Sequence, residues 1–156
     1  MDELSFHRAT EADTTVIAPM LREFYEYFSD IEYDDVQSPT ALRELLEDDS
    51  LGTLFLLRLG AEPIGYLALT YGFSLEFRGR YAFLDEFYIR PPYRARGYGK
   101  RALAFAGDAC RAAGVRALFL EVDRDNADGQ RLYRGAGFAP REHYHLFYKR
   151  VEENAP

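Results

Sequence analysis

The stretch from residue 81 to residue 122 constrains the fold most, because it combines a strand, a loop, a helix and a second strand. An apolar run over residues 81–89 is closed by two prolines, and an alanine-rich helical pattern over residues 102–113 ends at a glycine. Another apolar run, residues 117–122, follows directly. Two strands joined through a helix predict a parallel pair with a right-handed crossover.

The segments before and after this unit predict a mixed sheet. Thr10 and Asp13 have the spacing of a capping box, and Pro39 suits the first turn of a helix. The further predicted strands are residues 4–8, 53–59, 64–73 and 144–151, and the further predicted helices are residues 11–29, 38–46 and 126–136. Hairpins imply antiparallel pairing, so the predicted fold class is α/β, with a mixed, mostly antiparallel central sheet flanked by helices.

The length of 156 residues predicts one domain, residues 1–151, followed by a frayed tail, residues 152–156. No apolar run approaches the roughly 18 residues that a membrane span needs. The first residues also lack the pattern of a secretory signal. Cys110 is the only cysteine, which excludes an intramolecular disulfide and a multi-cysteine zinc site. We therefore expect a cytoplasmic protein without a membrane partner.

The formal net charge of −7 disfavours binding to nucleic acid and favours small cationic partners. Acidic residues crowd residues 23–49, whereas arginines crowd residues 90–101. The two regions suggest two ligands of opposite charge. His7, His143 and His145 have no neighbours in the sequence that suggest metal ligation, so no metal site is predicted.

A basic loop with two glycines links the strand at residues 81–89 to the following helix. It contains Arg94, Gly97 and Gly99. Glycines let a ligand approach the backbone closely, and a helix N-terminus favours an anion. We therefore favour a phosphate-binding loop over a solvated basic turn.

Two other phosphate-binding motifs fit this loop less well. A Walker P-loop is excluded because Lys100 is followed by Arg101 instead of Ser or Thr. Residues 97–102 formally fit a dinucleotide-binding fingerprint. That fingerprint follows its strand through a tight turn, whereas residues 90–95 intervene here.

Two sequence blocks carry a resemblance to a known family. Residues 94–99, Arg-Ala-Arg-Gly-Tyr-Gly, match the signature [Q/R]-x-x-G-x-[G/A] between a strand and a helix. Further along, residues 120–122 lead to Asn126 and then to residues 132–138, Leu-Tyr-Arg-Gly-Ala-Gly-Phe. In these blocks and in the order of its elements, the chain resembles the GNAT superfamily of acetyl-CoA-dependent N-acetyltransferases. The resemblance implies acetyl-CoA as cosubstrate, no metal, and a sheet that is splayed at the acetyl-CoA site.

A narrower likeness concerns the acids of the central strand. Asp85 and Glu86, followed by aromatic residues, are similar to the strand of spermidine/spermine-type (diamine) N-acetyltransferases, in which the glutamate comes first. The first helix is similar as well. The likeness implies that Glu26 and Tyr27 of that helix bind the substrate.

The resemblance also implies roles for individual residues. Tyr133 would protonate the leaving thiolate, and Glu86 or Asp85 would accept the proton of the amine. Successive strand residues face opposite sides, so only one of the acids can face the acceptor unless a bulge re-aims them. The implied contacts of CoA are the loop residues Arg94, Arg96, Gly97, Tyr98, Gly99 and Lys100 for the pyrophosphate, and Phe87, Tyr88, Ile89 and Asn126 for the pantetheine arm.

The expected function is acetyl transfer from acetyl-CoA to a primary amine in a ternary complex, and the acidic first half favours a small cationic amine. One alternative is the acetylation of a protein or peptide amine. Another is a module without catalysis that binds CoA or a dinucleotide.

Packing gives an alternative role for the acids and one further expectation. Without a catalytic role, one of the two central acids would form an ion pair with Arg78, Arg80 or Arg90. The apolar strand predicted at residues 144–151 suggests a homodimer paired through sheet edges.

Overall fold

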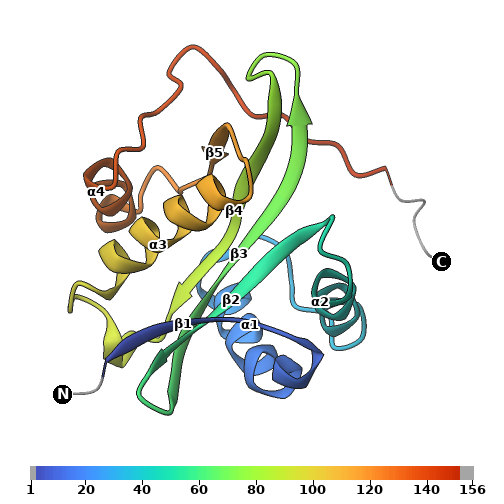
Figure 1. Ribbon diagram of the computed structural model, residues 1–156, viewed down its shortest axis with the longest axis vertical. Coiled ribbons are helices and arrows are strands. Elements are labelled where there is room, and N and C mark those ends of the chain that lie inside the picture. The colour runs from blue at the N-terminus through green and yellow to red at the C-terminus, as the bar shows by residue number, and fades with distance from the viewer. Residues whose placement is uncertain (1–2, 152–156) are drawn as a thin grey trace.

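Five strands form one sheet in the order β1-β2-β3-β4-β5 in the computed structural model, which describes residues 3–151 (Figure 1). The strands are β1 (Leu4–Arg8), β2 (Gly52–Leu59), β3 (Glu62–Ser74), β4 (Gly79–Ile89) and β5 (Ala117–Phe119). The first four pair antiparallel, and β5 runs parallel to β4. The predicted mixed, mostly antiparallel sheet is therefore confirmed.

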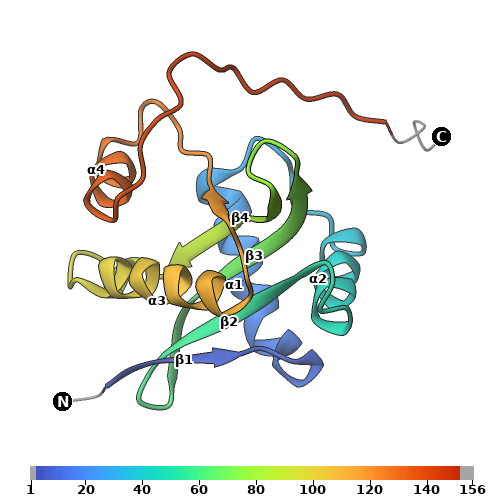
Figure 2. The ribbon, with the colours of Figure 1, turned by 45° about the horizontal axis from the view of Figure 1, so that its top comes forward.

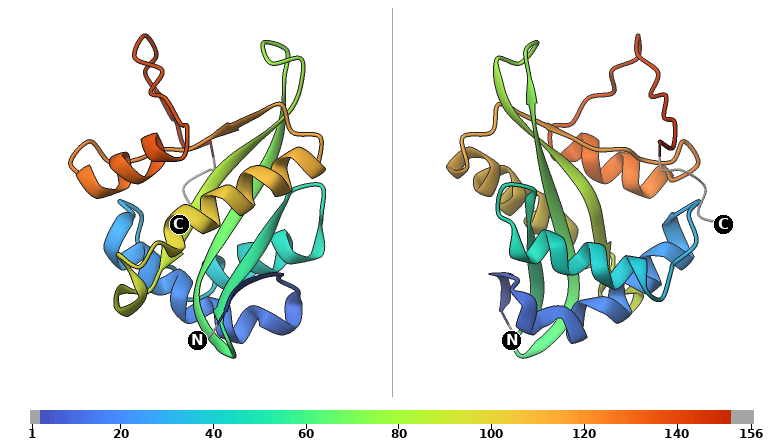
Figure 3. Two further views of the ribbon diagram at one scale, coloured as in Figure 1. Left: turned by 60° about the vertical axis from the view of Figure 1, so that its left-hand side comes forward. Right: turned by 90° about the vertical axis from the view of Figure 1, so that its right-hand side faces the viewer.

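Helices cover both faces of this sheet (Figure 3). They are α1 (Thr14–Phe28), α2 (Gln37–Glu47), α3 (Tyr98–Ala112) and α4 (Ala127–Gly135), with short 3-10 turns η1 (Glu11–Asp13) and η2 (Pro91–Tyr93). Side chains alternate along β3, so Tyr66 and Ala68 pack toward α1 and α2, whereas Leu67 and Leu69 pack toward α3. The sheet therefore separates two apolar cores, one under each pair of helices.

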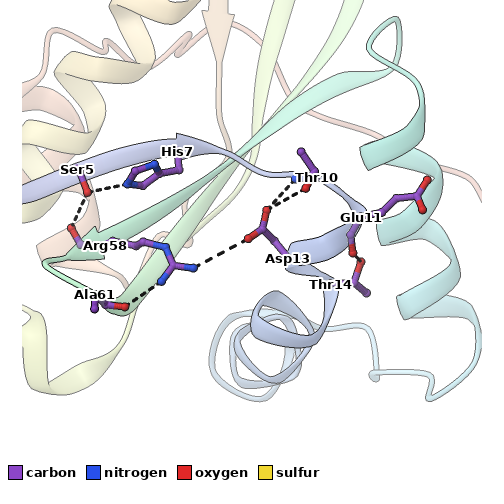
Figure 4. A network of polar contacts seen from close by, with 8 residues as sticks. All are labelled: Ser5, His7, Thr10, Glu11, Asp13, Thr14, Arg58 and Ala61. Carbon is purple, nitrogen blue, oxygen red and sulfur yellow. Dashed lines mark hydrogen bonds and ion pairs between the residues drawn. The ribbon is translucent and has the colours of Figure 1, made fainter.

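The predicted capping box fixes the entry of the first helical segment. The backbone N–H of Thr10 donates to Oδ2 of Asp13 at 2.9 Å. Arg58 of β2 lies 4.0 Å from the other carboxylate oxygen of Asp13 and donates to the carbonyl of Ala61 at 2.9 Å (Figure 4). These contacts tie the start of the helical layer to the β2–β3 turn.

The pairing of β4 with β5 is short and leaves part of β4 open. It runs from Tyr81, opposite Ala117, to Phe83, opposite Phe119, and then ends. Beyond this point, residues 84–89 of β4 have β3 on one side and no strand on the other within the described residues. The splayed sheet expected for this fold is therefore present.

Two strand predictions were wrong in extent. The strand predicted over residues 117–122 stops at Phe119, and residues 144–151 form no strand. The chain after α4 instead crosses the end of the β3–β4 hairpin and extends away from the sheet (Figure 2). A strand forms only where a neighbouring strand accepts its hydrogen bonds, and neither segment has such a neighbour among residues 3–151.

Smaller differences concern the ends of the helices. Helix α3 begins at Tyr98 and not at residue 102, and Asn126 is the N-cap of α4 rather than its first residue. The predicted tail, residues 152–156, lies outside the described residues. No helix of residues 3–151 is long and apolar enough to cross a membrane.

Candidate active site

A β-bulge in β4 places Asp85 and Glu86 on the same face of the sheet. Ala68 of β3 pairs with Glu86, whereas the next residue of β3, Leu69, pairs with Leu84. Asp85 is therefore the extra residue of the bulge. Leu84 and Phe87 both pack on the α3 side. Because side chains alternate along a strand, the two acids between them both face the α1 side. The bulge needed for both acids to face one ligand is therefore present.

Glu86 is half-buried and accepts a hydrogen bond from Tyr66 of β3. The distance from the Tyr66 hydroxyl to Oε2 of Glu86 is 2.8 Å, and Tyr66 itself is fully buried. Burial raises the pKa of Glu86 to about 7; the charge of Asp85 adds to this effect, and the hydrogen bond from Tyr66 opposes it. A carboxyl group with a pKa near neutrality can both accept and release a proton at physiological pH.

Tyr25 of α1 lies opposite the two acids. Burial raises the pKa of its hydroxyl, and the charges of Glu86 and Asp85 add to this shift. Asp85 is exposed, and partial desolvation raises the pKa of its carboxyl group. The acids therefore share one electrostatic environment between β4 and α1.

The two acids are not used in structural ion pairs. None of the ion pairs found among residues 3–151 involves Asp85 or Glu86. Arg90 instead pairs with Glu23 at 3.3 Å, and Arg80 lies over a tyrosine ring. The alternative in which one acid forms an ion pair at the edge of the sheet is therefore not observed among residues 3–151.

Two shallow hollows flank the end of α1. The first, of about 210 Å³, is lined by Tyr25, Glu26, Ser29, Asp30, Ile31, Glu32 and Tyr33. The second, of about 290 Å³, is lined by Glu23, Glu26, Tyr27, Tyr88, Arg90, Pro91 and Pro92. Glu26 lines both hollows, and Tyr27 is 61% exposed beside the second. The predicted substrate residues therefore lie on an acidic, aromatic surface close to the acids of β4.

The open edge of β4 presents backbone groups of Phe87 and Ile89. The N–H of Arg90 donates to the carbonyl of Ile64 on β3 at 2.9 Å. Since hydrogen-bonding directions alternate along an antiparallel pair, the backbone of Tyr88 also faces β3, whereas Phe87 and Ile89 face away from it. Of the three strand residues expected to contact pantetheine, Phe87 thus offers its backbone N–H and carbonyl on the open edge. Ile89 offers its N–H there, because its carbonyl accepts from Arg94. Tyr88 instead contributes a buried ring.

The glycine loop ends in an uncapped helix N-terminus. Gly97 is the N-cap of α3, has a φ of +82°, and provides no side-chain cap. The backbone N–H groups at the start of α3, from Tyr98 to Lys100, therefore remain available to a ligand, and Arg96 and Lys100 are exposed beside them. Such a combination fits a pyrophosphate group.

Arg94 contacts the end of β4 and the aromatic residues of α1. Its Nε donates to the carbonyl of Ile89 at 2.6 Å. Its guanidinium lies over the rings of Tyr27, Phe28 and Tyr88 at 5.4 to 5.8 Å from their centroids. These cation–π contacts connect the end of β4 to α1. A contact of Arg94 with phosphate stays a prediction.

Helix α4 packs closely against the start of α3. A Cβ on Gly99 would lie only 3.1 Å from Leu132, which explains the absence of a side chain there. Tyr133 is half-buried, packs edge-on against Phe138, and has a pKa raised by burial. The Oδ1 of Asn126 accepts from the N–H of Gly129 at 2.9 Å and caps α4. The pantetheine contact of Asn126 and the acid role of Tyr133 stay predictions.

Sequence reasoning missed Tyr66 and Glu23. The hydroxyl of Tyr88 donates to Oε2 of Glu23 at 2.8 Å, and burial raises the pKa of Tyr88 to about 12. A tyrosine inside an otherwise apolar strand needs a partner for its hydroxyl, and this signal could have pointed to Tyr66. The partner itself depends on the register between β3 and β4, which the bulge sets.

Comparison with known proteins decides the family. The model of the acetyltransferase (GNAT) family matches residues 17–138. The chain belongs to the GNAT family. This match includes the bulged strand, the glycine loop and Tyr133, so a dinucleotide-binding module is not favoured, and the chain is an acetyltransferase.

Several known proteins resemble the chain over most of its length. It is 24% identical over 135 residues to the uncharacterized N-acetyltransferase YhfO of Bacillus subtilis. The aligned region covers 86% of this chain and 89% of that protein. It is 27% identical over 125 residues to the IAA acetyltransferase of Azospirillum brasilense, covering 80% and 78%. The solved structure of integron cassette protein HFX_CASS3, from the mobile metagenome of Cole Harbour Salt Marsh, superposes with a TM-score of 0.83 at 30% identity, over 95% of this chain and 91% of that one.

Proposed function

We propose that this GNAT acetyltransferase transfers the acetyl group of acetyl-CoA to a small cationic primary amine, with Glu86 as the general base. The observation that carries the proposal is the environment of Glu86. Its carboxyl group has a pKa of about 7, accepts a hydrogen bond from Tyr66, and lies at the open part of β4. A base with this pKa is suited to deprotonate an ammonium group near neutral pH.

The chain offers suitable contacts for acetyl-CoA. The backbone groups of Phe87 and the N–H of Ile89, on the open edge of β4, suit the pantetheine amides, and the uncapped N-terminus of α3 at Gly97 suits the pyrophosphate. When bound, acetyl-CoA supplies an acetyl thioester that a nitrogen lone pair can attack. The C–N bond then forms as the C–S bond breaks.

Two protons must move in this reaction. Only a neutral amine has a free lone pair, so a proton passes from the amine nitrogen to Glu86, directly or through water. Tyr133 is the proposed donor to the leaving sulfur. Burial raises the pKa of Tyr133, which keeps its hydroxyl protonated. Cys110 is buried within the α3 core and takes no part as a nucleophile.

The surface charge near Glu86 supports a cationic acceptor. Glu26, Asp30 and Glu32 line the first hollow together with the rings of Tyr25 and Tyr33. Carboxylates attract an ammonium group, and tyrosine faces stabilise a cation by cation–π contact. A linear diamine or polyamine could place one amine near Glu86 and a second charge in this hollow.

A test compares Glu86→Gln and Tyr133→Phe with the original chain by release of free CoA thiol. We expect Glu86→Gln to lower kcat by roughly 10²- to 10⁴-fold, the usual contribution of a general base. Glu47→Gln, an exposed change at the end of α2, is the matched control and should leave kcat unchanged. Undiminished turnover by Glu86→Gln, with CoA still bound in a thermal-shift measurement, would overturn the assignment of the base.

The acceptor is tested separately with a panel of spermidine, an aminoglycoside and an N-terminally free peptide. We expect turnover of the small cations, and a higher KM for spermidine in Glu26→Gln with little change in kcat. Turnover of the peptide alone would replace the small-amine acceptor by a protein amine. That outcome would leave the role of Glu86 intact.

A further inference from the structure

Three aromatic rings surround the guanidinium of Arg94 where α1 ends beside β4. The guanidinium carbon lies 5.4 Å from the ring centroid of Tyr88, 5.5 Å from that of Phe28 and 5.8 Å from that of Tyr27. Phe28 packs edge-on against Tyr88, with 6.4 Å between the ring centroids. Aromatic faces attract cations, and several rings around one cation form a binding site for ammonium groups. The rings of Tyr27, Phe28 and Tyr88 are here called the aromatic cage.

The aromatic cage continues into the second hollow at the end of α1. Tyr27 and Tyr88 belong to both, and the hollow also contains the carboxylates of two glutamates, Glu23 and Glu26. Glu23 is already paired with Arg90 at 3.3 Å, whereas none of the ion pairs found among residues 3–151 includes Glu26. A cation in this hollow would therefore meet two ring faces and one unpaired carboxylate.

The aromatic cage also lies next to the proposed base. Tyr88 follows Glu86 by two residues on β4, so both side chains face α1, about 7 Å apart along the strand. The ring of Tyr66, which donates to Glu86, lies 6.2 Å from the ring of Tyr88. An acceptor whose amine reaches Glu86 can therefore place a second cationic group at the cage through a short alkyl chain.

Arg94 lies between this cation site and the loop proposed to bind CoA. Its Nε donates to the carbonyl of Ile89 at 2.6 Å, at the open edge of β4. The side chain of Arg94 is exposed, and the next residue, Ala95, has a φ of +59°, a strained conformation for a residue with a side chain. The loop then leads within two residues to Gly97 and the uncapped N-terminus of α3. A small movement of Arg94 would thus exchange the rings for the phosphate groups of CoA.

We propose that the aromatic cage is a cation subsite of the acceptor, that Arg94 fills it in the absence of cosubstrate, and that the phosphate groups of CoA draw Arg94 away. This inference rests on the proposed function, because it assigns a second binding group to the same cationic acceptor. Two like charges cannot share the cage, so Arg94 and the acceptor exclude each other. Guanidinium binds phosphate through charge-assisted, paired hydrogen bonds, which ring faces do not offer. Bound CoA should therefore raise the affinity for the acceptor.

Calorimetric titration of spermidine into the full chain, with and without saturating CoA, measures this coupling. CoA carries no acetyl group, so no turnover occurs. We expect CoA to lower the Kd of spermidine by roughly 5- to 150-fold, the usual range for two coupled sites, and spermidine to lower the Kd of CoA by the same factor. Equal Kd values of spermidine with and without CoA would overturn this inference alone. No binding of spermidine in either titration would overturn it together with the proposed acceptor.

Variants separate the action of Arg94 from a direct attraction between the two ligands. Arg94→Gln should bind spermidine more tightly than the original chain when CoA is absent, and its coupling factor should fall toward 1. Arg111→Gln makes the same change of charge at the exposed end of α3 and should keep the original coupling factor. Phe28→Leu removes one ring of the cage and should raise the Kd of spermidine in the presence of CoA. An undiminished coupling factor in Arg94→Gln would contradict the proposal.

NMR of the original chain observes Arg94 directly and does not depend on the folding of any variant. In the free protein, the side chain of Arg94 should show nuclear Overhauser contacts with the ring protons of Phe28 and Tyr88. We expect saturating CoA to remove these contacts, and spermidine added to the CoA complex to show contacts with the same rings. Contacts between Arg94 and the rings that persist in the CoA complex would refute the exchange.

Discussion

The hydroxyl of Tyr66 on β3 donates to Oε2 of Glu86 on β4 at 2.8 Å, and this hydrogen bond opposes the effect of burial on the Glu86 carboxyl group. Burial alone would favour the protonated acid. The hydrogen bond to the ionised form restrains the shift, so the pKa remains at about 7. Tyr66 is thus a positioning residue that adjusts the proposed base without contacting the acceptor.

Removal of this hydroxyl should move the pH dependence of the reaction. In Tyr66→Phe the ionised form of Glu86 loses its hydrogen bond, so its pKa rises above about 7. We expect the rising limb of kcat against pH to shift to higher pH, with a loss of rate at pH 7 and recovery at higher pH. Tyr71→Phe, which removes a 3.2 Å contact with Thr53, is the matched control. An unshifted limb in Tyr66→Phe would mean that the limb does not report Glu86.

The order and type of the central elements were predictable, because hydrophobic patterns and glycine positions are local signals. The bulge at Asp85 was not, because it arises from the register between β3 and β4 and leaves no mark in the strand itself. The partner of Tyr66 depends on the same register. The sequence therefore indicated the acids but not the contact that sets the pKa of Glu86.

At residues 144–151, by contrast, the sequence predicted a strand that the structure does not contain. Its apolar pattern is a genuine strand signal, but pattern alone does not say where the partner strand lies. Local propensity thus predicted a structure that the isolated chain does not form. The aromatic neighbours of Arg94 were not predictable for a related reason, since those on α1 are far away in the sequence.

The raised pKa of Glu86 should make stability depend on pH. The pKa rises from 4.5 to about 7 on folding, so the folded state holds its proton more tightly. The contribution of this proton to the free energy of unfolding is complete below about pH 4.5 and is lost as the pH rises through about 7. The total change is about 3 kcal/mol. Glu86→Gln has no such titration. Its stability relative to the original chain should therefore increase by about 3 kcal/mol from pH 4.5 to 8.5 in urea unfolding.

Glu47→Gln is the control for this measurement, since its carboxyl group is exposed on α2. Its curve should run parallel to that of the original chain. A difference between Glu86→Gln and the original chain that stays constant with pH would show that folding does not shift the pKa of Glu86.

Cys110 should be inert in the folded protein. It is 4% exposed, and burial raises its thiol pKa to about 11. The reactive thiolate is therefore scarce and shielded. We expect a disulfide reagent to react with Cys110 roughly 100-fold more slowly in the native protein than in urea. Rapid reaction in the native state would indicate that α3 opens locally, and would require Cys110→Ser for every assay that detects free CoA.

Gly97 at the N-cap of α3 and Gly107 inside the same helix should respond oppositely to alanine. Gly97 has open space around it but a φ of +82°, so Gly97→Ala should cost about 1 to 2 kcal/mol through backbone strain. Gly107 lies inside α3 with nothing within 4 Å of an added Cβ. Gly107→Ala should therefore stabilise by up to about 1 kcal/mol through helix propensity. Urea unfolding of both variants measures the pair. Equal effects of the two variants on the free energy of unfolding would mean that the loop relaxes out of the left-handed conformation. The N–H groups at the start of α3 would then no longer point to one place. In that case, Gly97→Ala should still bind CoA less tightly in a thermal-shift titration.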